Sequence, residues 1–300
     1  MGQIKIGNAP VSWGVEEIPD WGPQLPVDRV LGEMKKAGYL GTELGPWGYM
    51  PSEYAPLKEL LGKYGLVMVS AFCPINLHTG LLNEFEISEL RKEAKLLVGM
   101  GSKDIIIADS GSDSRYKIAG RVEAEAGDDK LDETLWKKLG ENLKIVTDIC
   151  RGYGLTVSFH PHVGTYIETA DEIKRFGEET KDLGLLYCLD TGHLAYAGAD
   201  PVALFKEHAG RLGVLHLKDV NLDLLAECRA KGYDFITSTK QGVFVPLGKG
   251  HVDYPSIFGT LRDSNYSGWV IVEQDRVLTE KDNPLEDAIQ SISYLRKFLP

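Results

Sequence analysis

The sequence lacks long apolar runs, paired-cysteine motifs and an excess of basic residues. No stretch approaches the roughly 18 consecutive apolar residues of a membrane-spanning helix, so we expect no membrane partner. Its 4 cysteines share no Cys-x-x-Cys spacing and lie in or beside apolar runs, which predicts reduced, buried thiols. The net charge of -11 argues against nucleic acid as a partner. The N-terminus has no basic segment followed by an apolar one, so we expect no signal peptide and a cytoplasmic location.

Short apolar segments rich in β-branched residues alternate with longer amphipathic segments along the chain. We predict strands at 4–9, 41–44, 66–72, 104–109, 155–160, 185–190, 213–218 and 269–274. We predict helices near 27–37, 54–64, 86–100, 131–152, 169–180, 201–208, 255–264 and 283–298. Eight strand-helix units in succession predict parallel pairing and closure into a (β/α)8, or TIM, barrel. No linker divides the chain, so we expect an α/β fold with one barrel domain over 1–300.

Two segments are predicted as long loops, at about 110–130 and about 219–250. The first reads SGSDSRYKIAGRVEAEAGDDK and follows the fourth predicted strand, and the second follows the seventh. Loops of this length in a compact domain usually bind ligands or cover a site. We therefore expect both segments to take part in function.

Nearly every predicted strand ends in a polar or ionisable residue. In chain order these residues are Asn8, Glu43, Cys73 with Asn76 just beyond it, Asp109, His160, Asp190, His216 and Glu273. Barrel enzymes carry their chemistry at the carboxyl ends of the strands, where these side chains would converge. Alternation along a strand also places His216 and Lys218 on one face, and Glu273 and Asp275 on one face. The pattern predicts an active site at this end of the barrel.

The last four strands supply a mixed set of imidazoles and carboxylates, namely His160, Asp190, His216 and Glu273. Such a set suits one divalent ion of the Mn²⁺, Co²⁺, Fe²⁺ or Zn²⁺ type, whereas Mg²⁺ prefers oxygen ligands alone. His193 then lies just behind Asp190 or contacts substrate. The alternative is that Asp190 caps the following turn and His193 is a satisfied polar residue. Four such residues at consecutive strand ends favour the metal site.

Four ordered motifs in the second half, CLDTGHLAYAG, VLHLKD, VPLGKGHVDYPSIF and GWVIVEQD, resemble the xylose-isomerase-like or endonuclease-IV-like barrel superfamily. Three motifs outside that set, IGNAPVSWG, GTELGPWGYMP and FHPHVGTYIET, resemble the inosose dehydratase family within it. The resemblance implies that Asp190, His216 and Glu273 are metal ligands. The fourth ligand of the related sugar epimerases is usually a Glu at the end of the fifth strand, where this chain has His160. Whether His160 or His162 binds the metal stays open.

The resemblance also implies a reaction and a substrate. It is the metal-dependent dehydration of 2-keto-myo-inositol to a trihydroxycyclohexanedione, in inositol catabolism. A base removes the proton next to the ketone and a hydroxyl leaves from the next carbon. Glu273 and His162 are candidates for base and acid, with roles unassigned, and Lys218 adds fixed positive charge for the enolate. The metal would act as a Lewis acid, with Mn²⁺ or Co²⁺ expected first and Zn²⁺ or Fe²⁺ as further options.

The first four loops are expected to set substrate specificity. The rings of Trp13, Trp47 and Tyr49 can pack on a cyclohexane-type polyol, and Glu43, Asn76 and Asp109 can accept its hydroxyls.

Two other functions stay open at this point. One is a sugar isomerase or epimerase that uses the same metal and enolate chemistry, and the other is a non-catalytic sugar-binding barrel. For the dehydratase and for the isomerase or epimerase, the small-molecule partner is a polyol or keto-cyclitol substrate. Barrels of this size often pair, so a homo-oligomer is also an option.

Overall fold

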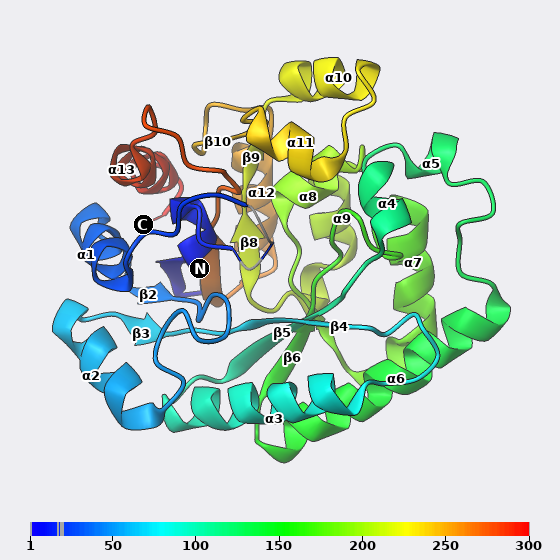
Figure 1. Cartoon of the computed structure of the whole chain (residues 1–300), viewed down its shortest axis with the longest axis horizontal. Helices are drawn as coiled ribbons and strands as arrows, with labels where there is room; N and C mark the ends of the chain where they lie inside the picture. The colour runs from blue at the N-terminus through cyan, green and yellow to red at the C-terminus, as the bar shows by residue number, and fades with distance from the viewer. Residues whose placement is uncertain (1, 17, 19–20, 300) are drawn as a thin grey trace.

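Parallel strands form a closed ring, and helices cover its outside (Figure 1). The computed structural model describes residues 2–16, 18 and 21–299. The strands are β1 (Ile4–Asn8), β2 (Gly41–Thr42), β3 (Val67–Met68), β4 (Phe72–Ile75), β5 (Asp104–Asp109), β6 (Thr156–Phe159), β7 (Leu186–Tyr187), β8 (Leu215–Leu217), β9 (Asp219–Val220), β10 (Phe244–Val245) and β11 (Gly268–Val272).

The pairing follows the ring in chain order. One parallel sheet runs β3-β2-β1-β11-β8 and the other runs β4-β5-β6-β7. Between β7 and β8 the ring is closed by the parallel bridges Tyr187–Leu212 and Asp190–His216. The third barrel strand is split, since β3 pairs with β2 and β4 pairs with β5. The predicted eight-stranded parallel barrel is therefore confirmed within the described residues.

The helices are α1 (Val27–Ala37), α2 (Tyr54–Tyr64), α3 (Glu84–Gly99), α4 (Asp113–Lys117), α5 (Val122–Glu125), α6 (Glu133–Gly152), α7 (Ala170–Glu179), α8 (Thr191–Tyr196), α9 (Pro201–Glu207), α10 (Leu222–Ala230), α11 (Phe235–Lys240), α12 (Tyr254–Asp263) and α13 (Pro284–Leu295). Three short 3₁₀ helices are also described, η1 (Pro10–Trp13), η2 (Lys181–Leu183) and η3 (Ala209–Arg211). The helices predicted at 27–37 and 54–64 begin and end at the observed residues.

Side-chain caps and apolar stripes explain where the helices lie. Thr169 and Glu172 form a reciprocal capping box at the start of α7. Along α6, Leu139, Leu143 and Val146 recur at helical spacing and are fully buried against the sheet. Burying a side chain of this size contributes about 1.5–3 kcal/mol. These periodic faces pack the helices onto the ring and fix the strand ends in space.

The predicted loops are largely structured, which corrects the expectation of irregular chain there. The first contains α4 and α5, and the second contains α10, α11 and the antiparallel pair β9–β10 (Figure 1). Helix starts in both carry N-cap side chains, such as Ser112, Asn221 and Asp234, that accept backbone N–H groups. The segments share a second small apolar cluster that includes Tyr196, Phe235 and other buried residues. They form an ordered layer beside the carboxyl ends of the strands.

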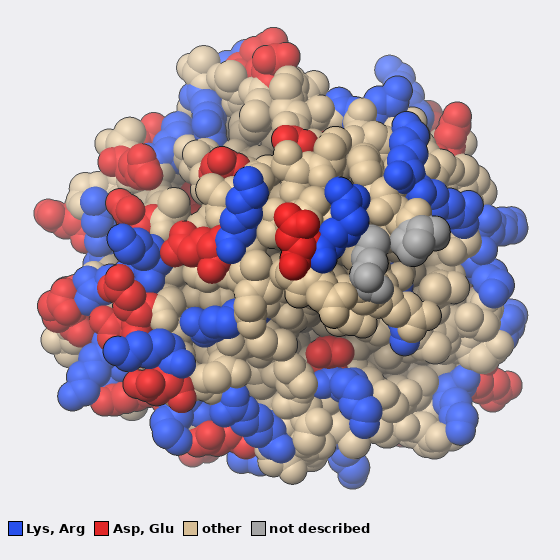
Figure 2. All heavy atoms as spheres, turned by 180° about the vertical axis from the view of Figure 1, so that it is seen from behind, with Lys and Arg blue, Asp and Glu red and all other residues tan. Residues whose placement is uncertain are grey.

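The outer surface is mixed in charge. Basic and acidic side chains are interspersed over the face in Figure 2. Their sum is a net charge of -11 for the chain. Among the helices of the described residues, none has both the length and the apolar composition of a membrane span.

Candidate active site

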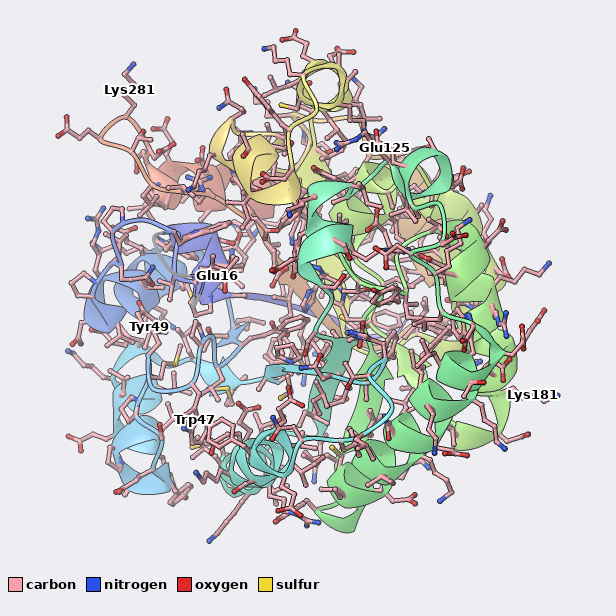
Figure 3. All side chains as sticks on the ribbon, turned by 45° about the vertical axis from the view of Figure 1, so that its right-hand side comes forward. Glu16, Trp47, Tyr49, Glu125, Lys181 and Lys281 are labelled. Atoms are coloured by element: carbon pink, nitrogen blue, oxygen red, sulfur yellow. The ribbon has the colours of Figure 1, made fainter. Side chains whose placement is uncertain are left out.

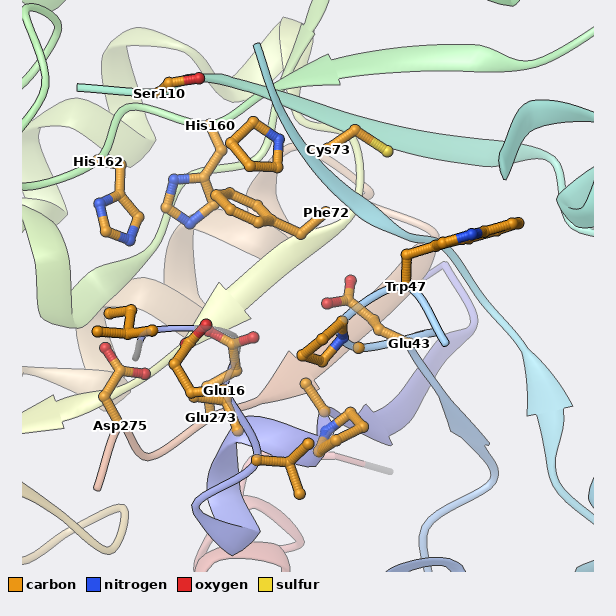
Figure 4. Close-up of a pocket in the computed structure, with 18 of the residues that line it drawn as sticks. Glu16, Glu43, Trp47, Phe72, Cys73, Ser110, His160, His162, Glu273 and Asp275 are labelled. Atoms are coloured by element: carbon orange, nitrogen blue, oxygen red, sulfur yellow. The ribbon is translucent and has the colours of Figure 1, made fainter. Parts of the chain in front are cut away.

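A cavity of about 640 Å³ opens at the carboxyl ends of the barrel strands. Figure 4 shows His160 and His162 facing Glu273 and Asp275 across it, with Glu43 and Trp47 to one side. The lining also includes Phe72 from β4 and Glu86 from α3. The cavity therefore joins the residues predicted from the strand ends to one face of α3.

Asp190 uses its two carboxylate oxygens for different tasks. Its Oδ1 atom accepts the backbone N–H groups of Gly192, at 2.7 Å, and His193, at 3.0 Å, and so caps α8. Its Oδ2 atom is fully buried and has no hydrogen-bond partner among the described residues. That oxygen lies 3.8 Å from His160 Nε2 and 3.9 Å from His216 Nδ1. The capping role and the role beside the imidazoles therefore coexist in one side chain.

His216 joins two carboxylates from distant strands. Its Nε2 atom lies 3.1 Å from Glu43 Oε1, and its Nδ1 atom lies 3.2 Å from Glu273 Oε2. Ser70 donates a hydrogen bond to the same Glu43 oxygen at 2.8 Å. Burial lowers the pKa of His216, but Cys188, Glu273 and Glu43 outweigh this and raise it well above its ordinary value. These two carboxylates favour the protonated ring, so a proton and a metal ion compete for its nitrogen atoms.

Lys218 lies among three carboxylates in the cavity wall. Its Nζ atom is 2.7 Å from Asp275 Oδ1 and 3.2 Å from both Asp190 Oδ2 and Glu273 Oε2. The side chain is 1% exposed. Burial would lower the pKa of Lys218, but the three carboxylates hold it above its ordinary value. The ammonium is therefore a fixed positive charge inside the cavity.

The same charges act on the carboxylates. Burial would raise the pKa of Glu273, but His216 and Lys218 outweigh it and lower the pKa to about 2. For Asp275, burial raises the pKa to about 6 even though Lys218 opposes this. Glu273 is therefore ionised at neutral pH.

Three imidazoles pack together at the end of β6 and the start of α8. The rings of His162 and His193 lie 3.8 Å apart between centroids, and those of His160 and His193 lie 5.5 Å apart. His162 Nδ1 lies 2.7 Å from the carbonyl oxygen of Val163, and burial lowers the pKa of His162 to about 3. His193 Nε2 lies 2.9 Å from Lys218 Nζ. All three rings line the cavity.

The donor set fits a divalent metal ion. Ligand atoms bonded to one such ion at about 2.0–2.2 Å lie about 3–4 Å apart, which the separations from Asp190 Oδ2 to His160 and His216 match. Three overlapping groups in the described chain have ligand atoms within 4.8 Å of one another, namely His160, Cys188 and His216; His160, Asp190 and His193; and Glu43, His216 and Glu273. Asp190 Oδ2 accepts no hydrogen bond within the described residues and has the Lys218 ammonium 3.2 Å away, so a metal ion bound there would compete with that lysine.

Some predicted substrate contacts lie elsewhere. Trp13 is 0% exposed, because η1 turns its ring into the core, and its Nε1 atom donates to Glu33 at 2.7 Å. Tyr49, which Figure 3 labels beside Trp47, donates its hydroxyl to the Leu25 carbonyl at 2.9 Å. Neither Trp13 nor Tyr49 is among the residues that line the cavity. Trp47 does line the cavity.

Asn76 and Asp109 hold loops in place. The Asn76 side-chain amide donates to Glu86 at 3.1 Å, and it is Glu86 that lines the cavity. Asp109 lines the cavity, but it lies 2.8 Å from His78 Nδ1 and also accepts the Leu77 N–H. Both residues hold parts of the cavity rim in place, and Asn76 does so through its hydrogen bond to Glu86.

Sequence reasoning missed several residues of the site. Asp275 was visible as the second residue on the Glu273 face, and the strand alternation could have assigned it. Phe235 contacts the rings of His162 and His193, with centroids 6.1 Å and 5.9 Å away, and Tyr116 also lines the cavity. Both belong to the segments predicted as loops, so they confirm that those segments reach the cavity. No local pattern identifies these two aromatic residues.

Asp219, the neighbour of Lys218, clamps a loop on the opposite side of the strand. Its Oδ2 atom accepts the N–H groups of Gly248, at 2.8 Å, and Gly250, at 2.9 Å. Its Oδ1 atom accepts the Val252 N–H at 3.1 Å. A Cβ atom at Gly250 would lie 2.3 Å from Asp219 Oδ1, so this close approach requires glycine.

Comparison with known proteins places these features in a family. The profile of the xylose isomerase-like TIM barrel family matches residues 31–298. The chain is 35% identical over 274 residues to an inosose dehydratase of Geobacillus kaustophilus (strain HTA426), covering 91% of this chain and 88% of the relative. It is 31% identical over 300 residues to an inosose dehydratase of Clostridium beijerinckii (strain ATCC 51743 / NCIMB 8052), covering 98% and 97%.

Solved structures show the same fold at lower identity. The probable 3-DHS dehydratase AsbF from Bacillus anthracis has a TM-score of 0.70 at 16% identity, covering 99% of both chains. An L-ribulose 3-epimerase has a TM-score of 0.69 at 16% identity, covering 100% of this chain and 95% of that one. These two likenesses concern the barrel itself.

Proposed function

The chain belongs to the inosose dehydratase family of xylose isomerase-like TIM barrels, and on that premise we propose that it dehydrates a keto-cyclitol. The substrate of the proposal is 2-keto-myo-inositol and the product is a trihydroxycyclohexanedione. The structural observation that carries the proposal is the buried Lys218 ammonium, which lies among carboxylates beside the imidazoles in one cavity. A site of this kind can stabilise an enolate and move protons around it.

Metal binding is part of the proposal. Asp190, His216 and Glu273 would hold one divalent ion, with His160 as the fourth ligand, because His160 Nε2 lies 3.8 Å from Asp190 Oδ2, an oxygen that accepts no hydrogen bond within the described residues. When bound, such an ion supplies Lewis acidity toward a ketone oxygen and its neighbouring hydroxyl. The mixed nitrogen and oxygen set favours Mn²⁺ or Co²⁺, with Zn²⁺ and Fe²⁺ as further options.

Lys218 stabilises negative charge that develops on the substrate. Its three carboxylate partners hold the ammonium in one position, so no reorganisation is needed when the enolate forms. Because the side chain is buried, water does not screen this charge.

His162 and His193 are placed to exchange hydrogen bonds or protons with the substrate. If His162 Nδ1–H donates to the Val163 carbonyl, its Nε2 atom is free to accept a hydrogen bond or a proton from the substrate, although burial makes it a weak base. If His193 Nε2 accepts from Lys218, its Nδ1–H has no partner within the described chain and can donate to the departing hydroxyl. The proton and hydroxide that leave make one water. Glu273 is the alternative base, although metal binding would weaken it.

Substrate recognition would use the opposite wall. Glu43 and Asp109 can accept ring hydroxyls, while Trp47 and Phe72 can cover an apolar face of the ring. A metal-dependent sugar isomerase or epimerase remains the second candidate, because solved epimerases share the fold. The epimerase activity ranks lower because the paired-carboxylate proton transfer of the epimerases needs a Glu at the end of β6, where this chain has His160.

The test is incubation of the purified protein with 2-keto-myo-inositol and Mn²⁺, with absorbance followed for the conjugated product. We expect a chromophore that requires the divalent ion and is at least about 100-fold slower to form in His162→Asn. The matched control is His251→Asn, a histidine outside the cavity. Turnover of a ketose with no chromophore from the cyclitol would instead assign the epimerase activity. Absence of stoichiometric metal and of any turnover would favour a binding barrel.

A further inference from the structure

We propose that His160, Cys188 and His216 form a second, inner coordination set that takes a soft divalent cation such as Zn²⁺. We call the metal ligands of the proposed function, His160, Asp190, His216 and Glu273, the outer set. The inference rests on the proposed function only because the inner set uses the same two histidines. One ligand atom from each of the three residues lies within 4.8 Å of the others. All three side chains are buried, with exposures of 2% for His160, 0% for Cys188 and 1% for His216.

The position of Cys188 follows from strand alternation. It lies two residues before Asp190, so both side chains face the barrel interior, with Cys188 one layer deeper. Around it are apolar interior residues such as Ala9, Ile106 and Ile271. The thiol is therefore the one soft ligand next to the imidazoles within the part of the chain that the structure describes.

An unpartnered imidazole nitrogen gives a second, independent reason. His160 Nδ1 is buried and has no hydrogen-bond partner within the described ranges. A buried polar atom of this kind usually has a bound water, ion or ligand in the functional state. The group of His160, Cys188 and His216 could hold such a cation without using Asp190.

The arrangement of Lys218 makes the inner set available. Its ammonium lies 3.2 Å from Asp190 Oδ2 and from Glu273 Oε2, so the outer carboxylates already have a positive partner. A cation in the inner set leaves these ion pairs in place, whereas a cation in the outer set must compete with them. Since both sets need the same two imidazoles, only one cation binds at a time.

Ligand chemistry decides which ion takes which set. A thiolate selects Zn²⁺, Co²⁺ and other soft or borderline ions, whereas carboxylates suit Mn²⁺. On binding, a metal–sulfur bond forms and the thiol proton passes to solvent, together with the ring proton of His216 where it is present. No oxidation state changes. The structure therefore assigns two modes, an outer one for harder ions and an inner one in which soft ions occupy the imidazoles away from the substrate oxygen.

The experiment uses Co²⁺ as the probe with the full-length protein and two variants. We expect unmodified protein and Cys150→Ala to bind one Co²⁺ with a near-ultraviolet sulfur-to-cobalt band, and Cys188→Ala to lose that band. Cys150 is the matched control because it is also fully buried, in α6. We also expect Zn²⁺ affinity to fall about tenfold or more in Cys188→Ala, with Mn²⁺ affinity changing less than about threefold.

The outcomes separate the two proposals. One Co²⁺ bound to unmodified protein with no sulfur band overturns the inner set and leaves the proposed function intact. A band that persists in Cys188→Ala overturns it as well, since another thiol would then be the ligand. Binding of no metal at all by unmodified protein counts against both proposals. The measurement on unmodified protein decides the question even if Cys188→Ala does not fold.

Discussion

Lys218 Nζ lies 3.2 Å from Asp190 Oδ2, the one oxygen of that carboxylate that no hydrogen bond in the described chain satisfies. The lysine therefore takes the position next to this oxygen that a metal ion would also occupy. An ammonium and a divalent cation compete for the same negative charge, and the balance between them sets how tightly the outer ligands hold metal.

Replacing Lys218 tests this competition. We expect Lys218→Met to lose about 3–5 kcal/mol of stability without metal, because three buried carboxylates lose their partner. Excess Mn²⁺ should restore more stability in the variant than in unmodified protein, while kcat falls about 100-fold or more. Thermal unfolding with chelator and with Mn²⁺ measures the difference, and Lys218→Arg, which keeps the charge, is the control. An equal gain from Mn²⁺ in unmodified protein and Lys218→Met would contradict the competition.

Asp190 offers a way to separate its two roles. Asp190→Asn keeps an oxygen that can accept the amides of Gly192 and His193 but removes the charge at Oδ2. We expect the metal affinity of Asp190→Asn to fall by about tenfold to 100-fold. Asp190→Ala should lose about 1 kcal/mol more stability than Asp190→Asn, because the helix cap is lost too.

The control for Asp190 is Asp200→Asn. Asp200 caps α9 through two backbone amides in the same way, but it is not among the residues that line the cavity. Metal content by elemental analysis and unfolding by heat are the two measurements. A fall in metal content in Asp200→Asn equal to that in Asp190→Asn would show that the effect is not specific to the carboxylate that faces the cavity.

Arg115 fastens the segment that carries Tyr116 to the barrel. It is 0% exposed, and it donates to the Thr165 carbonyl at 3.0 Å and to Glu172 Oε1 at 2.5 Å. We expect Arg115→Met to lose about 3 kcal/mol of stability, since these acceptors remain without a donor. Cleavage by protease within 110–130 should rise, and KM should rise more than kcat falls. Arg91→Met, at an exposed site on α3, should show neither effect.

The buried carboxyl group of Asp104 should make the free energy of unfolding depend on pH. Burial raises its pKa from 3.8 to about 6, so the folded protein binds this proton more tightly than the unfolded chain. Stability from this group is therefore fully present below about pH 4 and is lost as the pH rises through about 6. Asp104→Asn should be more stable than unmodified protein at pH 8, on the order of 1–2 kcal/mol, and the gain should vanish near pH 4.

The control for Asp104 is the exposed Asp263→Asn, which removes the same charge. Unfolding by denaturant at several pH values gives the two curves. A gain in Asp263→Asn with the same pH dependence would assign the effect to net charge rather than to burial.

The sequence predicts the barrel well because its signals are periodic and repeated. Long amphipathic segments such as 133–152 carry enough apolar positions for a helix to be recognised, and β-branched runs mark the strands. The short helices α4, α5, α8, α10 and α11 were missed. All of them except α5 begin at a capping Ser, Asp or Asn side chain, but a helix of one to three turns has too few positions to show a period.

The candidate site divides in a similar way. Residues on strands could be assigned, because alternation and parallel pairing fix which side chains meet, and Asp190 and His216 are paired directly across the closing bridge. Aromatic residues on connecting segments could not be assigned in this way. Trp13 and Trp47 read alike in sequence, yet one packs into the core and the other reaches the cavity. The direction of a loop side chain depends on contacts with residues far away in the chain.

Lys218 and Asp219 point in opposite directions from one strand. The segment at 248–252, which contacts Asp219, can therefore affect the position of Lys218 in the cavity. Because Asp219 accepts N–H groups from that segment, a bulkier residue at Gly250 would displace Asp219 and, through the backbone they share, the neighbouring lysine. Mutagenesis restricted to cavity-facing positions would miss this indirect effect on Lys218. When the substrate-binding wall of this scaffold is redesigned, the glycine-rich turn at 248–252 should therefore be kept unchanged.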